Sequence, residues 1–288
     1  MGETIWAVIP TFNRRELLRE RIGAILQQTR PPEVVWVRDN ASHDGSAQMI
    51  AREFPQVRLV CGRANLGSSG GFAEGIKAAF EGGADWIWLL DNDAIPQPEA
   101  LEQMLRHRIH QEGLSVAALG SLALWIDGNP HPMNRALPNW RFLQHYGWLK
   151  QIGCFPARWS SFVSVLMARV AVERYGIPYY DFFTWNDDLE YFGRIGRREL
   201  IVFAKDSVVI HKTPTPYTPG KSVGERFFYD VRNRLWVLRG RVFDPVEKLW
   251  LIGNFLGHIL EYLRSNGATG FAVIWRGVQA GLTTRPRS

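Results

Sequence analysis

The most constraining feature of this sequence is a regular alternation, in its first third, of short apolar runs with segments of helical periodicity. The apolar runs predict strands at Ile5–Ile9, Val34–Val37, Val57–Cys61 and Trp86–Leu90. The segments between them predict helices near Arg14–Gln28, Gly45–Phe54 and Ser69–Gly82. Strands that alternate with helices in this way form parallel crossovers. We therefore expect an α/β fold, with a Rossmann-like, mostly parallel sheet and helices on both faces.

Polar motifs stand where these strands end. They are Pro10-Thr11, Asp39-Asn40, the segment 62–71 and Asp91-Asn92-Asp93. The carboxyl ends of parallel strands meet at one edge of a sheet, and ligands of such sheets bind beyond that edge. The sequence therefore predicts a single site built from all four motifs.

The pattern loosens after a helix predicted near Pro98–Gln111. Residues Asp127–Lys150, rich in Pro, Asn, His and Trp, are expected to form a long loop, which in a compact domain is usually functional. Regular structure should resume in three elements, namely Ser161–Met167, a helix after Asp187-Asp188, and a strand near Ser207–Ile210 that ends at His211.

Charge and composition narrow the class of partner. The 288 residues carry a formal net charge of +6, which suits nucleotide phosphates or anionic lipid head groups. The basic residues form no single run, so we do not expect nucleic-acid binding. The two cysteines, Cys61 and Cys154, have no metal-type spacing and fit a reducing compartment.

Neither a signal peptide nor a membrane-spanning segment is expected. A strand pattern begins almost at once, without a basic region or a small-residue cleavage site. The longest apolar segment, Leu249–Leu263, is interrupted by polar residues and is shorter than the roughly 18 to 20 residues that a spanning helix needs. We therefore expect a cytoplasmic protein.

The motif Asp91-Asn92-Asp93 directly follows an apolar run. Two carboxylates two positions apart can both face Mg²⁺ or Mn²⁺ if the chain turns there, and such a cation can bridge a diphosphate. The same residues also form ordinary turns, because Asp and Asn are favoured at strand ends. The motif alone leaves both interpretations open.

Two further motifs have a ligand-binding and a structural interpretation. Asp39, at a strand end, can accept a hydrogen bond from the N3–H of a pyrimidine. The Gly-rich segment Asn65–Phe72 opens a helix and can offer backbone N–H groups to an anion. Its spacing differs from a dinucleotide fingerprint, which disfavours a dehydrogenase. Loop capping and close helix packing are the structural alternatives.

Three acids lie within four positions in Asp187-Asp188-Leu189-Glu190, next to aromatic residues that include Trp185. Acids favour helix N-termini, so the run can be a solvated helix start. In an aromatic setting, a partly desolvated carboxylate would suit a general base for an acceptor hydroxyl. His211 can be either a structural histidine or a neutral metal ligand.

Together these motifs resemble the family 2 inverting glycosyltransferases of the GT-A fold. The resemblance covers about residues 4–212 and rests on Val8–Arg14, Asp39–Ser46, Asn65–Phe72, Asp91–Ala94 and Asp187–Tyr191. The Asn-x-Gly-x-x-Gly-Gly-Phe and Asp-Asp-x-Glu-Tyr elements are most similar to the galactofuranosyltransferase and rhamnosyltransferase branch. The resemblance implies transfer of a sugar from a nucleotide-diphosphate donor in a single displacement, with inversion at the anomeric carbon.

The resemblance also implies which residues hold the donor. Thr11, Asn13 and Asp39 would hold the nucleoside. The other residues expected at the nucleotide-sugar site are Pro10, Arg14, Asn65, Gly70, Gly71, Asp91, Asn92 and Trp185.

The same resemblance implies a metal site and a base. Mn²⁺ or Mg²⁺, and with it the diphosphate, would be bound by Asp91, Asp93 and His211. Asp188 would be the catalytic base, with Asp187 as the rival assignment. Glu190 would orient the base or contact the acceptor.

The chain would then divide into three parts. Residues 1–212 would form the catalytic domain, with a nucleotide-sugar half over about 1–95 and an acceptor half over about 96–212. The Pro-rich segment 213–223 can be neither regular helix nor central strand and is expected to be a flexible linker or lid. Residues 224–288 would form a C-terminal helical segment, and within it Arg226–Arg234 resembles an element of this branch that packs near the site.

An apolar stripe marks the C-terminal segment. It consists of Leu249, Ile252, Leu256, Ile259 and Leu263 at helical spacing. The stripe can belong to an amphipathic helix pair at a membrane surface, to a cap on the catalytic domain, or to a homo-oligomer contact. The resemblance favours peripheral contact with the anionic inner face of the cell membrane, where lipid-linked acceptors reside.

Two other classes of protein use similar parts. A sugar-1-phosphate nucleotidyltransferase would carry a Gly-rich, basic loop after the first strand, where this chain has Pro10–Arg14. A non-catalytic sugar-nucleotide-binding module would have no use for the acids of Asp187–Glu190. A transferase with a UDP- or dTDP-sugar and a glycan or lipid-linked acceptor, active in cell-surface polysaccharide synthesis, is therefore preferred. The first choice of sugar is galactofuranose and the second is rhamnose.

Overall fold

The first half of the chain builds a parallel sheet. The computed structural model describes residues 2–110, 114–215, 218–222 and 224–287. Its first four strands are β1 (Ile5–Thr11), β2 (Val34–Asp39), β3 (Arg58–Cys61) and β4 (Trp86–Leu90). β1 pairs in parallel with both β2 and β4, and β2 pairs in parallel with β3. All four strands were predicted from the sequence, β4 with the same ends and the others to within two residues.

The second half widens this sheet with strands of both directions. They are β5 (Ala94–Pro96), β6 (Ile109–His110), β7 (Leu114–Leu124), β8 (Cys154–Ala157), β9 (Ser164–Ala168) and β10 (Leu200–His211). The sheet has the order β3-β2-β1-β4-β9-β7-β10-β5, with β6 on β7 and β8 on β10. β9 runs antiparallel between β4 and β7, whereas β7 and β10 are parallel. The expected α/β fold is confirmed, and β9 joins its two parallel portions.

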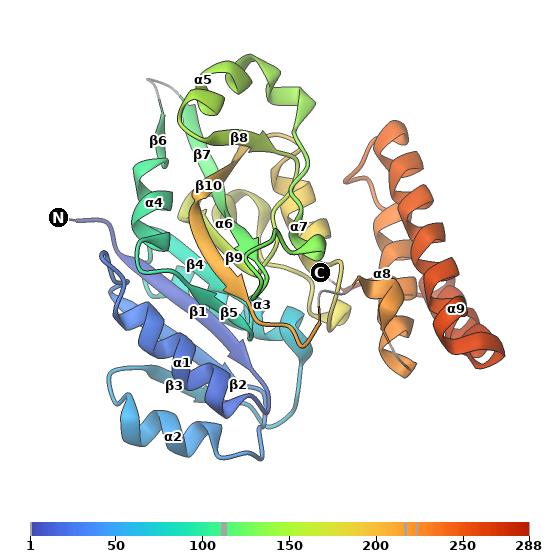
Figure 1. Ribbon diagram of the computed structural model, residues 1–288, viewed down its shortest axis with the longest axis horizontal. Coiled ribbons are helices and arrows are strands. Elements are labelled where there is room, and N and C mark those ends of the chain that lie inside the picture. Colours follow the sequence, from blue (N-terminus) through green and yellow to red (C-terminus); the bar gives the residue numbers. More distant parts are fainter. Residues whose placement is uncertain (1, 111–113, 216–217, 223, 288) are drawn as a thin grey trace.

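Helices cover both faces of the sheet, as Figure 1 shows. One face carries α1 (Arg15–Leu26), α2 (Ser46–Glu53), α4 (Ala100–Arg106) and α5 (Tyr146–Gln151), and the other carries α3 (Gly67–Glu81), α6 (Arg169–Tyr175) and α7 (Asp187–Ile195). Ile5, Ala7 and Ile9 of β1 pack on the first face, and Trp6 and Val8 pack on the second. Both faces are apolar because both are covered, which explains the unbroken apolar runs in the sequence.

Two predictions in the middle of the chain were wrong in extent. The helix expected to reach Gln111 ends at Arg106, and β6 follows; Gln111 itself lies outside the described residues. The expected long loop Asp127–Lys150 contains short 3₁₀ helices at Pro132–Asn134 and Trp140–His145, and then α5. His131 and Asn139 cap the two short helices with their side chains. Side-chain capping can hold such a segment without an apolar period, so periodicity could not reveal it.

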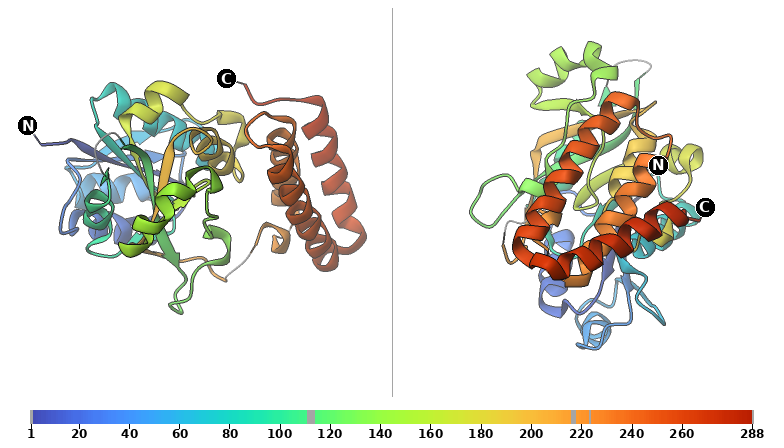
Figure 2. Two further views of the ribbon diagram at one scale, coloured as in Figure 1. Left: turned by 90° about the horizontal axis from the view of Figure 1, so that it is seen from above. Right: turned by 90° about the vertical axis from the view of Figure 1, so that its right-hand side faces the viewer.

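The C-terminal helices form a separate layer beside α7 (Figure 1). They are α8 (Phe227–Arg239) and α9 (Pro245–Thr283). Gly267, with φ of 56°, divides α9 into two arms that meet in a V (Figure 2). Gly277 and Gly281 let the second arm approach α8, because a Cβ at either position would lie 2.7 to 2.8 Å from Val231 or Leu235.

The apolar stripe predicted on α9 is only partly packed, because Ile259 contacts the core of this layer while three other members face outward. Leu249, Ile252 and Leu256 are 70%, 39% and 54% exposed. The packed face of the helix is formed instead by Leu251, Phe255 and Tyr262. Among the described residues, no helix combines the length and the apolarity needed to cross a bilayer.

The segment 213–223, predicted to be a linker or lid, joins β10 to these helices. Pro216, Tyr217 and Val223 lie outside the described residues. The described part includes a 3₁₀ turn at Pro219–Lys221 whose Gly220 is buried against α9.

Candidate active site

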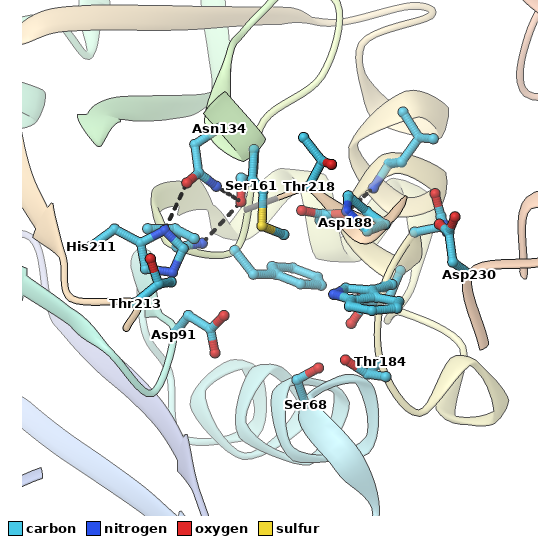
Figure 3. Close-up of a pocket in the computed structure, with 18 of the residues that line it drawn as sticks. Ser68, Asp91, Asn134, Ser161, Thr184, Asp188, His211, Thr213, Thr218 and Asp230 are labelled. Carbon is cyan, nitrogen blue, oxygen red and sulfur yellow. Dashed lines mark hydrogen bonds between the residues drawn. The ribbon is translucent and has the colours of Figure 1, made fainter. Parts of the chain in front are cut away.

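A cavity of about 1250 Å³ lies at the carboxyl edge of the sheet. Its lining comes from the ends of β1 and β4, the start of α7, and the C-terminal helices α8 and α9. Typical small-ligand pockets have about 300 to 1,000 Å³, so this cavity has room for more than one substrate group. Figure 3 shows Asp91 and His211 on one side of it and Asp188 on the other.

Asp91, Asp93 and His211 form a cluster on the sheet side of the cavity. One potential ligand atom from each lies within 4.8 Å of the others. The chain turns after β4, where the Ala94 N–H donates to the Asp91 carbonyl. β5 then pairs with β10 in a register that sets Ala94 opposite His211. This antiparallel pairing brings together residues that are far apart in the sequence.

The hydrogen bonds around His211 test whether a cation fits the cluster. Nδ1 of His211 lies 2.8 Å from Oδ1 of Asn134, which can only accept, so Nδ1 carries a proton. Nε2 of a neutral ring then presents a lone pair to Oδ1 of Asp93 at 2.9 Å. Two acceptors that face each other require a cation between them, either a proton on the ring or a metal ion. Carboxylate and imidazole ligands suit Mn²⁺ or Mg²⁺, so the residues fit such an ion.

The charges around this cluster are unequal. Burial raises the pKa of Asp91, and the neighbouring Asp93 raises it further. Burial acts in the same direction on Asp93, but His211 and Arg21 outweigh it and lower the pKa of that carboxyl. Asp93 therefore remains ionised where its neighbour resists ionisation.

Arg21 is a buried cation that the sequence analysis missed. It is fully buried, and its guanidinium donates to the main-chain carbonyl of Asp91. Burial lowers its pKa to about 10, while Asp91 and Asp93 pull it up. Arg21 stands in the buried stripe of α1 with Leu18, Ile22 and Ile25, and a cation in such a stripe was the available signal.

Asp187 and Asp188 begin α7 on the opposite side of the cavity, and both line it. Oδ2 of Asp187 accepts a hydrogen bond of 2.7 Å from the Ser69 hydroxyl. Burial raises the pKa of Asp187 to about 7, and Asp188 adds to this effect. Burial also raises the pKa of Asp188, against hydrogen bonds from the Leu189 N–H and the Ser161 hydroxyl. Carboxyl groups with raised pKa values can take up a proton near neutral pH.

Helix α8 holds the loop that places these two acids. The Asn233 side-chain amide donates to the carbonyls of Phe182, Thr184 and Trp185 at 2.9, 2.8 and 2.8 Å. Residues 183, 185 and 186 all have φ of 63°, which is uncommon for residues with side chains. The loop is thus held in a strained shape by a helix from the C-terminal layer.

Six of the residues expected around the donor line the cavity together with Asp91. They are Pro10, Thr11, Arg14, Asn65, Asn92 and Trp185. The Thr11 hydroxyl is buried and has no hydrogen-bond partner among the described residues, so it is available to a ligand. These side chains come from three strand ends and the loop before α7.

Five other expected residues are not part of the cavity lining. They are Asn13, Asp39, Gly70, Gly71 and Glu190. Oδ1 of Asn13 accepts from the His43 N–H at 2.8 Å, and Oδ1 of Asp39 accepts from the Ser42 N–H at 3.0 Å. These bonds close the loop after β2. Each bond uses only one atom of the side chain, Oδ1, so the expected nucleoside contacts of Asn13 and Asp39 stay a prediction.

Gly70 and Gly71 serve helix packing. A Cβ at Gly71 would lie 2.5 Å from the Cβ of Pro10, and one at Gly70 would lie 2.5 Å from the Cβ of Leu66. The α3 N-terminus meets protein groups, because the Ser69 N–H donates to the Phe183 carbonyl. Glu190 is buried in an ion pair of 2.9 Å with Arg194 and is not part of the cavity lining, and its expected role in orienting the base or contacting the acceptor stays a prediction.

The far wall of the cavity belongs to α8, α9 and the turn before them. The Arg226 guanidinium stacks 4.7 Å from the centre of the Trp185 ring. Asp230, fully buried, faces Arg234 and His258 at 3.4 Å each. The resemblance placed Arg226–Arg234 near the site, and Arg226, Asp230 and Arg234 do line the cavity. The contribution of α9, through Asn254 and His258, was not predicted, because it depends on the packing of α8 on α9.

The sequence is similar to a known family and to curated proteins. A family model described as glycosyl transferase family 2 matches residues 6–150. The galactofuranosyltransferase GlfT1 of Mycolicibacterium smegmatis is 29% identical over 205 residues, which are 69% of this chain and 67% of that protein. GlfT1 of Mycobacterium tuberculosis is 38% identical over 102 residues, which are 34% of this chain and 33% of that protein.

Solved structures share the fold at low sequence identity. TarS of S. aureus in complex with UDP-GlcNAc superposes with a TM-score of 0.61 at 13% identity, over 95% of this chain and 79% of that chain. The mannosyltransferase PcManGT from Pyrobaculum calidifontis, in complex with GDP-Man and Mn²⁺, has a TM-score of 0.56 at 15% identity, over 99% of this chain and 82% of that one. The family model covers half of the chain, so the chain belongs to glycosyl transferase family 2 and is a glycosyltransferase related to the galactofuranosyltransferases.

Proposed function

We propose that the protein is a metal-dependent inverting glycosyltransferase that moves a hexose from a UDP- or dTDP-sugar to a saccharide or lipid-linked acceptor. The observation that carries this proposal is one cavity with Asp91, Asp93 and His211 on one side and Asp187 and Asp188 on the other. Galactofuranose is the first choice of sugar, because the curated relatives are galactofuranosyltransferases. Rhamnose is the second. Cell-surface polysaccharide synthesis is the proposed setting.

The proposed reaction is a single in-line displacement. Asp188 takes the proton of the acceptor hydroxyl while the hydroxyl oxygen bonds to the anomeric carbon. The bond from that carbon to the diphosphate oxygen breaks on the opposite face, and the electron pair leaves with the diphosphate. Mn²⁺ or Mg²⁺, held by Asp91, Asp93 and His211, would neutralise the charge on the departing diphosphate. A single displacement inverts the anomeric centre.

The choice of Asp188 over Asp187 rests on their exposure, since both carboxylates accept hydrogen bonds. Asp187 is tied to Ser69 of α3 and is only 5% exposed, whereas Asp188 is half-buried at the cavity wall. The more accessible carboxylate is better placed to meet an acceptor hydroxyl. Asp187 lies next to this base and remains the rival assignment for it.

The exposed face of α9 supports a membrane partner. Large apolar side chains that include Leu256, Phe271 and Trp275 are 54%, 64% and 68% exposed on this helix. Arg264 and Arg276, also exposed, flank them. Apolar side chains beside cations suit the interface of an anionic bilayer, so we propose peripheral binding to the inner face of the cell membrane.

A flotation assay tests this partner with vesicles of phosphatidylglycerol and phosphatidylcholine. Wild-type protein should float and the Phe271→Ser/Trp275→Ser variant should not, while Trp140→Ser, an exposed tryptophan outside α9, serves as the matched control. Protein that stays in solution as a dimer, lost in the double variant, would assign the face to a homo-oligomer instead.

The donor and the metal are tested together by thermal shift with UDP, dTDP or GDP, with and without Mn²⁺. A nucleotide at 100 times its Kd should stabilise the fold by about 2.7 kcal/mol. We expect one nucleotide to act only with Mn²⁺, and Asp93→Ala to abolish the shift. Asp127→Asn, an exposed acid outside the cavity, should keep it. If no nucleotide acts under any condition, the transferase proposal fails and a binding module for another ligand becomes the better reading.

A further inference from the structure

We propose that Asn134 is a positioning residue whose amide couples the metal side of the cavity to the base side. The inference rests on the proposed function, because it takes His211 as a metal ligand and Asp188 as the base. Asn134 belongs to the 3₁₀ turn Pro132–Asn134, inside the segment that the sequence predicted to be a loop. Figure 3 shows its amide between His211 and Ser161, with a hydrogen bond to each.

The carbonyl end of the amide sets the state of His211. Oδ1 of Asn134 lies 2.8 Å from Nδ1 of His211. An amide oxygen can only accept, so the proton of a neutral ring stays on Nδ1 and the lone pair of Nε2 points toward Asp93 and the metal site. Without this acceptor, a neutral ring would gain more by carrying its proton on Nε2, 2.9 Å from Oδ1 of Asp93. That tautomer cannot bind a metal through Nε2.

The amino end of the same amide sets the direction of the Ser161 hydroxyl. Nδ2 of Asn134 donates to Oγ of Ser161 at 3.0 Å, and the Val163 N–H donates to the same oxygen at 3.3 Å. Both lone pairs of the hydroxyl are then occupied, so its proton is free to be donated. Asp188 lines the same cavity and has its pKa lowered by this hydroxyl, so we assign the proton to that carboxylate.

The observed contacts run from Asp93 through His211 and Asn134 to Ser161, and the inferred step from Ser161 to Asp188 completes one directional chain. Turning the amide by 180° would set an N–H against Nδ1 and an oxygen against Ser161, and both ends of the chain would reverse. The turn that carries Asn134 is itself fixed, because His131 caps it and is buried with Nε2 2.9 Å from the Thr213 hydroxyl. The geometry thus allows one residue to prepare both halves of the reaction.

The substitution Asn134→Asp should keep the hydrogen bond to His211 and remove the one donated to Ser161. The carboxylate can still accept from Nδ1 of His211, so Mn²⁺ affinity should be kept. Its second oxygen accepts where the amide donated, so the Ser161 hydroxyl should turn away from Asp188. We expect Asn134→Asp and Ser161→Ala to lower kcat by about 10- to 100-fold without weakening Mn²⁺ binding. The double variant should lose no more than either single variant.

The substitution Asn134→Leu, apolar and similar in size, removes both hydrogen bonds, the one to His211 and the one to Ser161. It should weaken Mn²⁺ binding by about 10- to 100-fold as well as lower kcat. Mn²⁺ affinity is measured by electron paramagnetic resonance of the free ion. Turnover is measured as UDP or dTDP released from UDP-galactofuranose or dTDP-rhamnose.

A third readout needs neither metal nor turnover. Nitrogen-15 spectra of the metal-free protein at alkaline pH should show the His211 proton on Nδ1 in wild type and in Asn134→Asp, and on Nε2 in Asn134→Leu. The His211→Gln variant identifies the signal. Wild-type turnover in Asn134→Asp, or an unchanged His211 signal in Asn134→Leu, would overturn the coupling. Wild-type protein that neither binds Mn²⁺ nor releases nucleotide would overturn the proposed function instead, and the spectra would still report on the Asn134 bond.

Discussion

The two acid pairs of the cavity differ in the groups that surround them. Asp91 and Asp93 lie beside a buried guanidinium and an imidazole, from Arg21 and His211. Asp187 and Asp188 instead receive hydrogen bonds from hydroxyl and backbone N–H groups. The imidazole and the guanidinium lower the pKa of Asp93, whereas burial and Asp93 keep the pKa of Asp91 raised. Burial raises the pKa values of Asp187 and Asp188, and their hydrogen bonds offset only part of this effect. Residues of the same type are thus prepared for different chemistry by their neighbours.

This difference separates a ligand from a base. A metal ligand must stay ionised, whereas a base must be able to take a proton in the reaction. The raised pKa of Asp91 has part of its cause in Asp93, and a bound cation would relieve that repulsion. Replacing each acid by its amide keeps the shape and removes the charge, so the comparison can be tested residue by residue.

The largest effect is expected on the metal side. Asp91→Asn and Asp93→Asn should each lower turnover by about a thousandfold or more, because a bound metal contributes several kcal/mol to the stability of the transition state. Mn²⁺ binding, followed by electron paramagnetic resonance, should be lost with it. Asp127→Asn is the matched control. A variant that keeps Mn²⁺ affinity but not turnover would remove that residue from the metal site.

A smaller loss is expected on the base side, without loss of metal. Asp188→Asn should lower kcat by about 10²-fold or more, the usual share of a general base, and leave Mn²⁺ and nucleotide binding unchanged. Asp187→Asn should cost less, because that carboxyl is only 5% exposed and is less accessible to an acceptor hydroxyl. Steady-state kinetics with both variants decide the assignment. The reverse order of the two losses would transfer the base to Asp187.

The smallest effect concerns stability and pH. The pKa of Asp187 in the folded protein is about 7, above its ordinary value of 3.8. Between these values the folded protein binds more protons than the unfolded chain, so this group makes stability fall as pH rises from about 4 to about 7. Urea unfolding at several pH values should show this slope in wild type and a shallower one in Asp187→Asn. Identical slopes would mean that Asp187 ionises normally.

The near wall of the cavity could be predicted from the sequence. Apolar runs located β1, β2 and β4, and the rule that parallel strand ends share an edge placed Thr11 and Asp91 near each other. The antiparallel β9 was harder, since its apolar run looks the same in either direction. The rule that acids start helices was enough to find the beginning of α7.

The rest of the site depends on contacts that no local pattern reports. Asn134 acts through an amide in a short turn, and periodicity does not register a turn of three residues. The stripe on α9 was visible in the sequence, but tertiary packing decides which face of a helix is buried. In this helix Leu251 and Phe255 are buried, whereas Leu249 and Leu256 are exposed. The orientation of the Asp39 and Asn13 side chains toward the loop after β2 likewise depends on side-chain rotation.

The hydrogen bonds of Asn233 link the position of α8 to the position of the loop before α7. The Asn233 amide of α8 donates to three main-chain carbonyls of the loop that leads into α7. Helix α8 in turn packs along α9. A displacement of α8 therefore either breaks these bonds or carries the loop with it. The C-terminal layer thus connects the exposed face of α9 with the loop before Asp187 and Asp188. If the bonds hold, a shift of α8 would change the spacing between the two acid pairs.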